Sequence, residues 1–407
     1  MGEELARGSS SINRVLMIAP TPFFADRGCH VRIYEEARAL QGMGCQVEVC
    51  TYHLGDDRPG LPTHRTLRIP WYSKLSAGFA WHKLYVDLLL LLKAWSVARR
   101  FRPDVIHGHL HEGAVLGWAV GRFLGIPVVG DFQGSLSEEL VAHGTIPSQG
   151  RLYRFVANSE GRIARLPQVA VASCDDVAKE LHERFSVPDV ILALDGVDTA
   201  VFHPGVDLGD VQALVPQGRR PVVYLGLLNT YQGVDLLLQA IPQVLARVPQ
   251  AYFLVMGYPD EDEYRHKAHG MGLADHVCFP GRIDYDQAPR YLALGEVAVG
   301  PKLSQTESNG KLYNYMACAL PTVAFDTPPS REILGDLGVY APRGNVAALA
   351  DAIASLLENP ESSRRLGLEL RRRVVDQFSW QNTARQLMAA YERAITKRAG
   401  RRRGDLA

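Results

Sequence analysis

The chain has 407 residues with 44 basic (Lys and Arg) and 44 acidic residues, so its formal net charge is zero and gives no argument for a nucleic-acid partner. This length exceeds one typical hydrophobic core and favours two domains of about 180 to 200 residues each. The 6 cysteines include no Cys-x-x-Cys pair, which argues against a zinc or disulfide framework and indicates reduced thiols in a cytoplasmic protein.

The first residues lack the basic and apolar regions of a signal peptide, and residues 1–11 are expected to form a loose tail. Residues 14–19 then predict a buried strand, residues 20–28 a loop before a helix that ends near Gly42, and residues 46–51 the next strand. This order predicts a doubly wound parallel sheet. No Gly-x-Gly-x-x-Gly lies between the first strand and its helix, and this argues against a nicotinamide-dependent oxidoreductase.

A leucine-rich run within residues 79–101 predicts a helix that is too short and too interrupted to span a bilayer. Aromatic and basic residues surround it, namely Trp71, Tyr72, Lys74, Trp81, His82, Lys83, Lys93, Arg99 and Arg100. This mixture would suit a helix that lies on an anionic membrane. The alternative, a core helix with a solvated basic side, is the one that the sequence favours.

Three alternating histidines, His107, His109 and His111, would share one face if their strand continued, as in many metal sites. Gly108 and a helical pattern from Gly113 predict instead that the strand ends near His107 and leaves the other two in a loop. We therefore expect no metal site here.

Strands expected at residues 168–172 and 190–194 continue the first sheet. A Pro/Gly-bounded loop and a polar linker at residues 205–220 then mark a domain boundary. We divide the chain into a first domain over residues 12–196, a second over residues 197–375, and a C-terminal helix with a basic tail over residues 376–407.

The most informative stretch follows a strand expected at residues 297–299. Its polar segment leads into an apolar helix, which Ser308 or Asn309 can cap and which has Gly310 in its first turn. The helix start favours an anion, and Lys311 adds a full positive charge. The acidic run 260–262 more simply begins a helix than binds a metal.

This stretch resembles the donor-binding segment of glycosyltransferase family 4, the retaining GT-B enzymes. That family has two Glu separated by seven residues before Ala-Met-Ala-x-Gly-x-Pro. Residues 316–321 keep the end of this pattern, Asn314 takes the second acidic position, and Glu307 lies one residue nearer than the family spacing. The resemblance covers about residues 14–396 and implies an α/β GT-B fold, with two Rossmann-like doubly wound domains facing across a cleft and the last helix crossing back to the first domain.

The resemblance also assigns site residues. It implies His111 as the catalytic histidine beside the donor sugar, with His109 as its fallback, and Glu307 as a second catalytic residue. The implied donor-binding residues are Gly226, Arg282, Ser308, Asn309, Gly310, Lys311, Leu312 and Asn314. The acceptor-side candidates are Gly28, His30, Asp131 and Gln133, and no residue is assigned to a metal.

The family also carries an Arg and a Lys that contact the donor diphosphate, at the positions that Leu227 and Gln232 occupy here. A buried diphosphate needs cationic partners. Lys311 is the best candidate to replace the pair, and Lys302, Arg282 and Arg331 are weaker alternatives.

The resemblance therefore implies a retaining, metal-independent hexosyltransferase that moves a sugar from a nucleoside diphosphate sugar to an acceptor hydroxyl of a glycan, a lipid-linked molecule or a small molecule. The nucleotide sugar is a co-substrate, and no cofactor is expected. The expected location is cytoplasmic, with peripheral contact at the inner face of a membrane left open. The alternative is a catalytically impaired member that acts as a nucleotide-binding or structural subunit.

Overall fold

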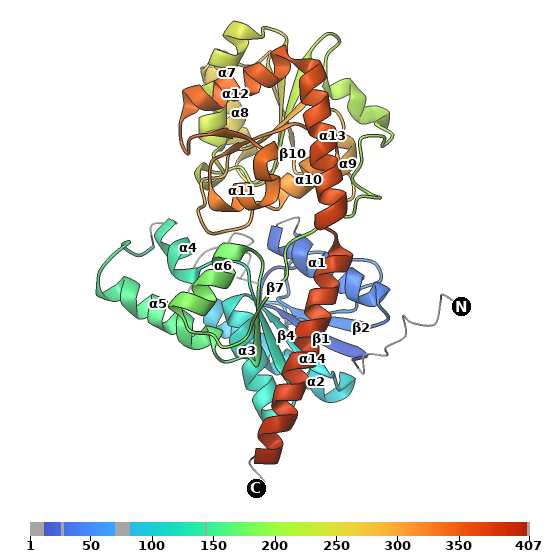
Figure 1. Ribbon diagram of the computed structural model, residues 1–407, viewed down its shortest axis with the longest axis vertical. Coiled ribbons are helices and arrows are strands. Elements are labelled where there is room, and N and C mark those ends of the chain that lie inside the picture. The colour runs from blue at the N-terminus through green and yellow to red at the C-terminus, as the bar shows by residue number, and fades with distance from the viewer. Residues whose placement is uncertain (1–11, 26–27, 70–81, 143–144, 405–407) are drawn as a thin grey trace. The chain divides into compact units, whose positions relative to one another are not determined.

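The computed structural model describes residues 12–25, 28–69, 82–142 and 145–404, which form two compact units, each with its own sheet (Figure 1). The first unit comprises residues 1–25, 29–194 and 381–407, and the second comprises residues 26–28 and 195–380. Several predictions concern residues outside the described part: the tail at 1–11 and the residues Trp71, Tyr72, Lys74 and Trp81.

The first unit contains a parallel sheet with the strand order β3-β2-β1-β4-β5-β6-β7, so the prediction of a doubly wound sheet is confirmed. Its strands are β1 (Arg14–Ala19), β2 (Gln46–Thr51), β3 (Thr63–Arg65), β4 (Val105–His109), β5 (Val128–Phe132), β6 (Val169–Ala172) and β7 (Val190–Leu192). Its α-helices are α1 (Gly28–Gly42), α2 (His82–Phe101), α3 (Leu110–Leu124), α4 (Leu136–Ala142), α5 (Arg151–Ala164), α6 (Asp175–Lys179) and α14 (Trp380–Gly404). A π-helical turn, Glu180–Arg184, follows α6.

Two helical layers cover this sheet. The connection through α1 runs along the sheet in the opposite direction to those through α2, α3 and α5, so right-handed crossovers place α1 on the other face. Ile106 of β4 packs in the core beneath α2 and α3, whereas the next residue, His107, contacts Tyr391 of α14. Because side chains alternate along a strand, α14 shares the face of α1.

The helix expected at residues 79–101 is α2 over its described part. Its inner side packs into the core through residues such as Val86, Leu90 and Ala94, which confirms the core-helix interpretation for that side. No helix among the described residues is long and apolar enough to cross a bilayer.

The prediction that β4 ends near His107 is wrong. The strand continues to His109 because it stays paired with β5, where His109 lies opposite Asp131. Helix α3 begins at the next residue, Leu110, which takes a positive φ of 61°. His111 therefore lies in the first turn of a helix, not in a loop.

The second unit contains a parallel sheet in the order β10-β9-β8-β11-β12-β13. Its strands are β8 (Arg220–Leu225), β9 (Ala251–Met256), β10 (Val277–Gly281), β11 (Val297–Gly300), β12 (Thr322–Phe325) and β13 (Val339–Ala341). Its α-helices are α7 (Val234–Arg247), α8 (Glu261–Gly270), α9 (Ala288–Leu292), α10 (Lys311–Ala317), α11 (Pro328–Leu334), α12 (Val346–Glu358) and α13 (Pro360–Gln377). Short 3-10 helices span Gly209–Leu214, Thr230–Gln232 and Gly335–Leu337.

The predicted order of strand, polar segment, helix and strand is present as β11, α10 and β12. The predicted cap is wrong, however, because α10 starts at Lys311 with Gly310 at the N-cap position and no side-chain cap. Ser308 instead donates a hydrogen bond of 3.0 Å to Oδ2 of Asp195. The run at residues 260–262 does start a helix, since α8 begins at Glu261.

Candidate functional site

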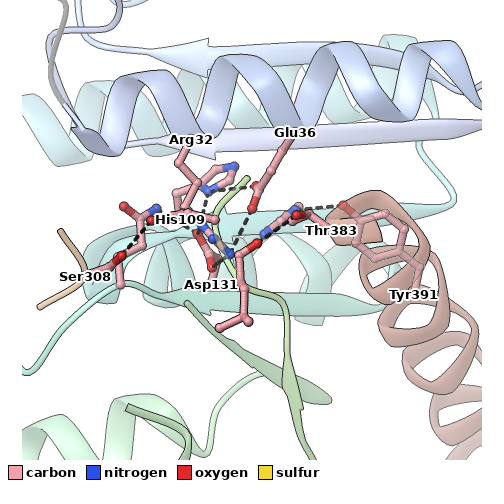
Figure 2. Close-up of polar contacts among 11 residues, drawn as sticks. Arg32, Glu36, His109, Asp131, Ser308, Thr383 and Tyr391 are labelled. Atoms are coloured by element: carbon pink, nitrogen blue, oxygen red, sulfur yellow. Dashed lines mark hydrogen bonds and ion pairs between the residues drawn. The ribbon is translucent and has the colours of Figure 1, made fainter. Parts of the chain in front are cut away.

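The first cluster of site residues lies at the carboxyl ends of β4 and β5, the edge where open α/β sheets bind ligands. Arg32 of α1 binds both oxygens of Asp131, through Nε at 3.2 Å and an NH2 group at 2.9 Å. The same NH2 group lies 2.9 Å from Glu36, one turn along the helix. Figure 2 shows these side chains converging with His109. Arg32, Glu36 and Asp131 are all buried, so this is a desolvated network of charges.

Asp131 orients the imidazole of His109. Its Oδ2 accepts from Nδ1 of His109 at 3.1 Å and from Nε2 of Gln133 at 2.7 Å. A proton on Nδ1 leaves the lone pair of the neutral ring on Nε2, and this atom has no hydrogen-bond partner among the described residues. The ring is thus held from one side and offers an acceptor on the other.

A second histidine stacks on the first. The rings of His107 and His109 have centroids 4.2 Å apart, and Nδ1 of His107 lies 2.8 Å from the hydroxyl of Tyr391. Burial, followed by the charge of His109, holds the pKa of His107 well below its ordinary value. Burial would raise the pKa of Asp131, but Arg32 and the hydrogen bond from His109 outweigh it and hold that pKa below its ordinary value.

Glu36, His107, His109 and Asp131 each offer one possible metal-ligand atom, and these atoms lie within 4.8 Å of one another. Such a set of imidazoles and carboxylates is chemically suited to a transition metal. Arg32 already places a positive charge against both carboxylates, so the cluster has a counter-charge without an ion. The absence of a metal from this site stays a prediction.

His30 holds the loop after β1. Its Nδ1 accepts from the backbone N–H of Ala25 at 2.9 Å, so the proton of the neutral ring lies on Nε2, which is 2.5 Å from Oγ1 of Thr21. Gly28 is the first residue of α1. The acceptor-side roles of both residues stay predictions.

His111 belongs to a different cluster from His109. Its Nε2 lies 3.3 Å from Oε1 of Glu160, and its ring packs edge-on against Phe132. Glu160 also accepts from the backbone N–H groups of Leu136 and Ser137. Burial would raise the pKa of Glu160, but the hydrogen bond from His111 contributes most to holding it below its ordinary value.

The site residues of the second unit gather around Lys311. Its Nζ donates to Oε1 of Gln232 at 2.8 Å and to the hydroxyl of Tyr224 at 3.2 Å, and it lies 4.3 Å from the centroid of the Tyr224 ring. Gly226 follows β8 with a φ of 154°, and a Cβ there would come within 2.5 Å of Nζ. The glycine therefore leaves room for the ammonium group.

Lys311 has no carboxylate within ion-pair distance in the part of the chain that the structure describes. Burial of the amine, with the charge of Lys302 as the next cause, holds its pKa well below its ordinary value. An ammonium group with only neutral partners is a favourable place for an anionic ligand.

A second lysine holds the segment before α10. Nζ of Lys302 lies 2.9 Å from Oε2 of Glu307 and donates to the backbone carbonyl of Ser308 at 2.8 Å. The hydroxyl of Tyr231 donates to the same Oε2 at 3.1 Å. Glu307, the second residue predicted to be catalytic, is thus held by Lys302 and Tyr231.

Asn309 is buried, and neither polar atom of its side chain has a partner among the described residues. Gly310 is the N-cap of α10, and Asn314 lies one turn into this helix. The side chain of Leu312 packs in the core, so only its backbone could meet a donor. Arg282 is exposed at the end of β10 over the ring of Tyr258, and Arg331 pairs with Asp326 at 2.7 Å.

Sequence reasoning missed Arg32, Glu36, Tyr391 and Asp195 as parts of these clusters. Arg32 and Glu36 stand four residues apart on a helix, a spacing that normally indicates a solvated ion pair. The available signal was their place among apolar residues of the same helix, such as Ile33 and Ala37. Tyr391 carried no local signal, since 284 residues separate it from His107.

Comparisons with known proteins bear on both units. Residues 27–194 match the family described as a glycosyl transferase 4-like domain, and residues 219–359 match the family described as glycosyl transferases group 1. The chain is 27% identical over 398 residues to the phosphatidyl-myo-inositol mannosyltransferase of Mycobacterium leprae, covering 94% of this chain and 97% of that protein. It is 23% identical over 394 residues to the D-inositol 3-phosphate glycosyltransferase of Jonesia denitrificans, covering 90% and 91%.

Among solved structures, sucrose-phosphate synthase from Thermosynechococcus elongatus matches with a TM-score of 0.78 at 20% identity, covering 95% of this chain and 100% of that chain. Likeness at this identity shows the fold alone. It confirms the predicted α/β GT-B fold class with two Rossmann-like units.

Proposed function

The chain belongs to the glycosyltransferases with a 4-like first domain and a group 1 second domain, and from this we propose that it moves a hexosyl group from a nucleoside diphosphate sugar to a hydroxyl with retention at the anomeric carbon. The observation that carries the proposal is the position of Lys311. Its ammonium group lies beside Gly226 and Gln232. The resemblance implies that the donor diphosphate binds at this place, and this chain lacks the basic pair that the family usually has there.

The donor diphosphate would supply the negative charge that Lys311 lacks among the described residues. One phosphate accepts from the ammonium group, and the buried side-chain amide of Asn309, which has no partner among the described residues, offers a further donor and acceptor. Two of the three weaker candidates are already paired with carboxylates, since Lys302 pairs with Glu307 and Arg331 pairs with Asp326, and the third, Arg282, lies over the ring of Tyr258. This difference supports Lys311 as the main phosphate ligand.

In the reaction, the bond between the anomeric carbon and the diphosphate oxygen breaks, and a bond to the acceptor oxygen forms. The acceptor proton leaves with the departing diphosphate. Lys311 stabilises the negative charge that develops on the leaving group, so the step needs no strong nucleophile and no metal. Charge stabilisation of this kind fits the electrostatic character of the site.

A histidine at the carboxyl end of β4 or in the first turn of α3 is the group that we place beside the sugar. The resemblance assigns His111, but its imidazole is engaged with Glu160. Nε2 of His109 has no partner among the described residues, and Asp131 fixes the ring from the other side. We therefore propose His109 for this role, with Asp131 and Arg32 as its positioning residues.

We further propose a lipid-linked acceptor and peripheral contact with a membrane. Two relatives carry inositol acceptors in their names, and one of these acceptors is a lipid. Helix α2 supports the contact, because Leu88 and Leu92 are exposed on it near Arg99 and Arg100.

A donor panel tests the proposal. Thermal shifts with UDP, GDP, ADP and their sugars identify the nucleotide, and transfer from the best donor to phosphatidylinositol or slow donor hydrolysis then reports activity. The product's anomeric configuration, read by NMR, should match that of the donor. Tight binding without transfer or hydrolysis would contradict the proposal and favour a nucleotide-binding subunit.

A further inference from the structure

The outer surface of the first unit's larger helical layer has an unusual composition. Helix α2 packs beside α3, and α3 packs beside α5. The ring of Trp95 on α2 contacts that of Phe123 on α3, with centroids 5.7 Å apart. The solvent-facing positions of the three helices therefore form one continuous surface on the sheet face opposite α1.

Two kinds of side chain make up this surface. In the described part of the three helices, the exposed arginines are Arg99, Arg100, Arg122, Arg151, Arg154 and Arg162, and the exposed large apolar residues are Leu88, Leu92, Trp118, Phe123, Leu152 and Phe155. The other exposed positions are Ser96 and Asn158. We call these twelve arginines and apolar residues the arginine/apolar face. Its apolar members stand far out of the core, since Phe123 is 76% exposed and Phe155 is 67% exposed.

The acidic residues of the same helices are not among their exposed positions. Each of the three helices has one acidic residue in its described part. Asp87 of α2 accepts a hydrogen bond from Tyr52 at 2.5 Å, and Glu112 of α3 pairs with Lys83. Glu160 is buried against the start of α4. None of these acidic residues is an exposed position in the described part of the three helices, so the helices themselves offer little negative charge to offset the arginines.

Most arginines of the face have no acidic partner. Among the described residues, Arg99, Arg122, Arg151 and Arg162 make no ion pair, while Arg100 lies 3.7 Å from Glu48. Free guanidinium groups bind phosphate through paired N–H donors. The chain as a whole has zero formal charge, so attraction to an anionic partner must be local to this face.

We propose that the arginine/apolar face docks on an anionic lipid bilayer, with the guanidinium groups on lipid phosphates and the aromatic and leucine side chains in the head-group region. Arginines interleaved with large apolar residues suit such an interface. A nucleic acid would pair with the arginines but leave Leu88, Leu92 and Leu152 exposed to water. This inference specifies the surface for the membrane contact proposed above and extends it from α2 to α3 and α5.

Co-sedimentation with vesicles tests the inference. The full-length protein should bind vesicles of equal parts phosphatidylglycerol and phosphatidylcholine at low salt, bind pure phosphatidylcholine far more weakly, and dissociate as salt is added. The triple variant R122E/R154E/R162E should bind the anionic vesicles at least about tenfold more weakly. The variant L92S/F123S/F155S should also lose binding, because it removes the inserted side chains.

Matched controls come from the exposed surface of α13. Arg364, Arg365 and Arg372 are exposed and make no ion pair among the described residues, so R364E/R365E/R372E changes the net charge equally and should leave vesicle binding within about twofold. L368S/V375S is the apolar control. Unchanged circular dichroism and nucleoside diphosphate binding show that each variant is folded.

Several results would overturn the inference. These are no vesicle binding at low salt, equal binding to neutral vesicles, equal loss in the α13 variants, or duplex DNA that binds more tightly than the vesicles and displaces them. The assay contains no sugar donor, so it is separable from the proposed function. Vesicle binding without sugar transfer contradicts only that function, and transfer to a soluble acceptor without vesicle binding contradicts only the docking face.

Discussion

Nζ of Lys311 donates a hydrogen bond of 2.8 Å to Oε1 of Gln232, so a side chain from α10 supplies positive charge beside a position where related enzymes are expected to have their own lysine. The two residues are 79 positions apart in the sequence. Because the two side chains are in contact, we expect Lys311 to bind the diphosphate in place of the missing basic pair, and substitution of Lys311 can test this.

Replacing Lys311 with Ala should weaken nucleoside diphosphate binding by roughly 1.5 to 3 kcal/mol, the range for a hydrogen bond to a charged group. Binding of the uncharged nucleoside should not change. Calorimetric titration of both ligands measures the difference, and Lys179→Ala, at an exposed lysine of α6, is the control. An unchanged diphosphate affinity would remove Lys311 from the site.

Diphosphate binding should be accompanied by proton uptake. In the empty protein the pKa of Lys311 is lowered, first by burial and then by Lys302, so part of the population loses its proton at a pH below the usual value of about 10.4. A bound diphosphate favours the charged amine and raises that pKa. Affinity should therefore fall as pH rises through the lowered pKa.

Titrations in buffers of different ionisation enthalpy report this uptake. In Lys311→Met the uptake should disappear. Between the lowered pKa and the ordinary value, the unfolded chain holds more protons than the folded one, so the stability of the empty wild type should rise with pH relative to that of the variant. Equal proton uptake by both proteins would assign the titration to another group.

His109 at the end of β4 and His111 in the first turn of α3 should differ in their effects. His109→Ala should lower kcat roughly 100-fold or more, the scale for removing a group that stabilises charge in the transition state, with little change in nucleoside diphosphate affinity. His111→Ala should instead lower stability by about 1 to 3 kcal/mol, because buried Glu160 loses a partner. Steady-state rates, nucleotide titrations and denaturant unfolding separate these effects. A larger loss of kcat in His111→Ala would return the sugar-side role to His111.

Arg32→Met should destabilise the first unit by about 3 to 5 kcal/mol, because Asp131 and Glu36 would remain as buried carboxylates without their counter-charge. Denaturant unfolding measures the change. Combining the substitution with Asp131→Asn and Glu36→Gln should recover part of the loss. Arg38→Met, at an exposed position of the same helix, should change stability by less than about 0.5 kcal/mol. Equal losses in the two single variants would show that the buried charge network contributes little.

Local patterns were sufficient to predict most of the strands and helices. Residues 322–325 form a short apolar run after Pro321, and the structure has β12 over the same residues. The proximity of Lys311 to Gly226 and Gln232 could also be predicted from the order of the elements. Parallel strand-loop-helix units bring the carboxyl ends of neighbouring strands, here β8 and β11, to the same edge of the sheet.

The end of β4 was placed too early because Gly108 was interpreted as a strand breaker, and the local pattern does not show what a glycine inside a strand packs against. The structure gives another reason for Gly108: a Cβ there would lie 2.2 Å from the carbonyl oxygen of Gly113, so the close approach of α3 requires a glycine inside the strand. The burial of Arg32 likewise depends on Asp131, 99 residues away, and no local pattern carries that information.

Helix α14 packs on the first unit although it follows the whole second unit in the sequence. Its residues Thr383, Met388 and Tyr391 contact Leu194, Cys45 and His107. A nascent chain on the ribosome therefore carries the first sheet with one face incompletely covered while the entire second unit is translated. The first unit can reach its final packing only after α14 has been synthesised, and loss of α14 would damage the N-terminal half of the protein.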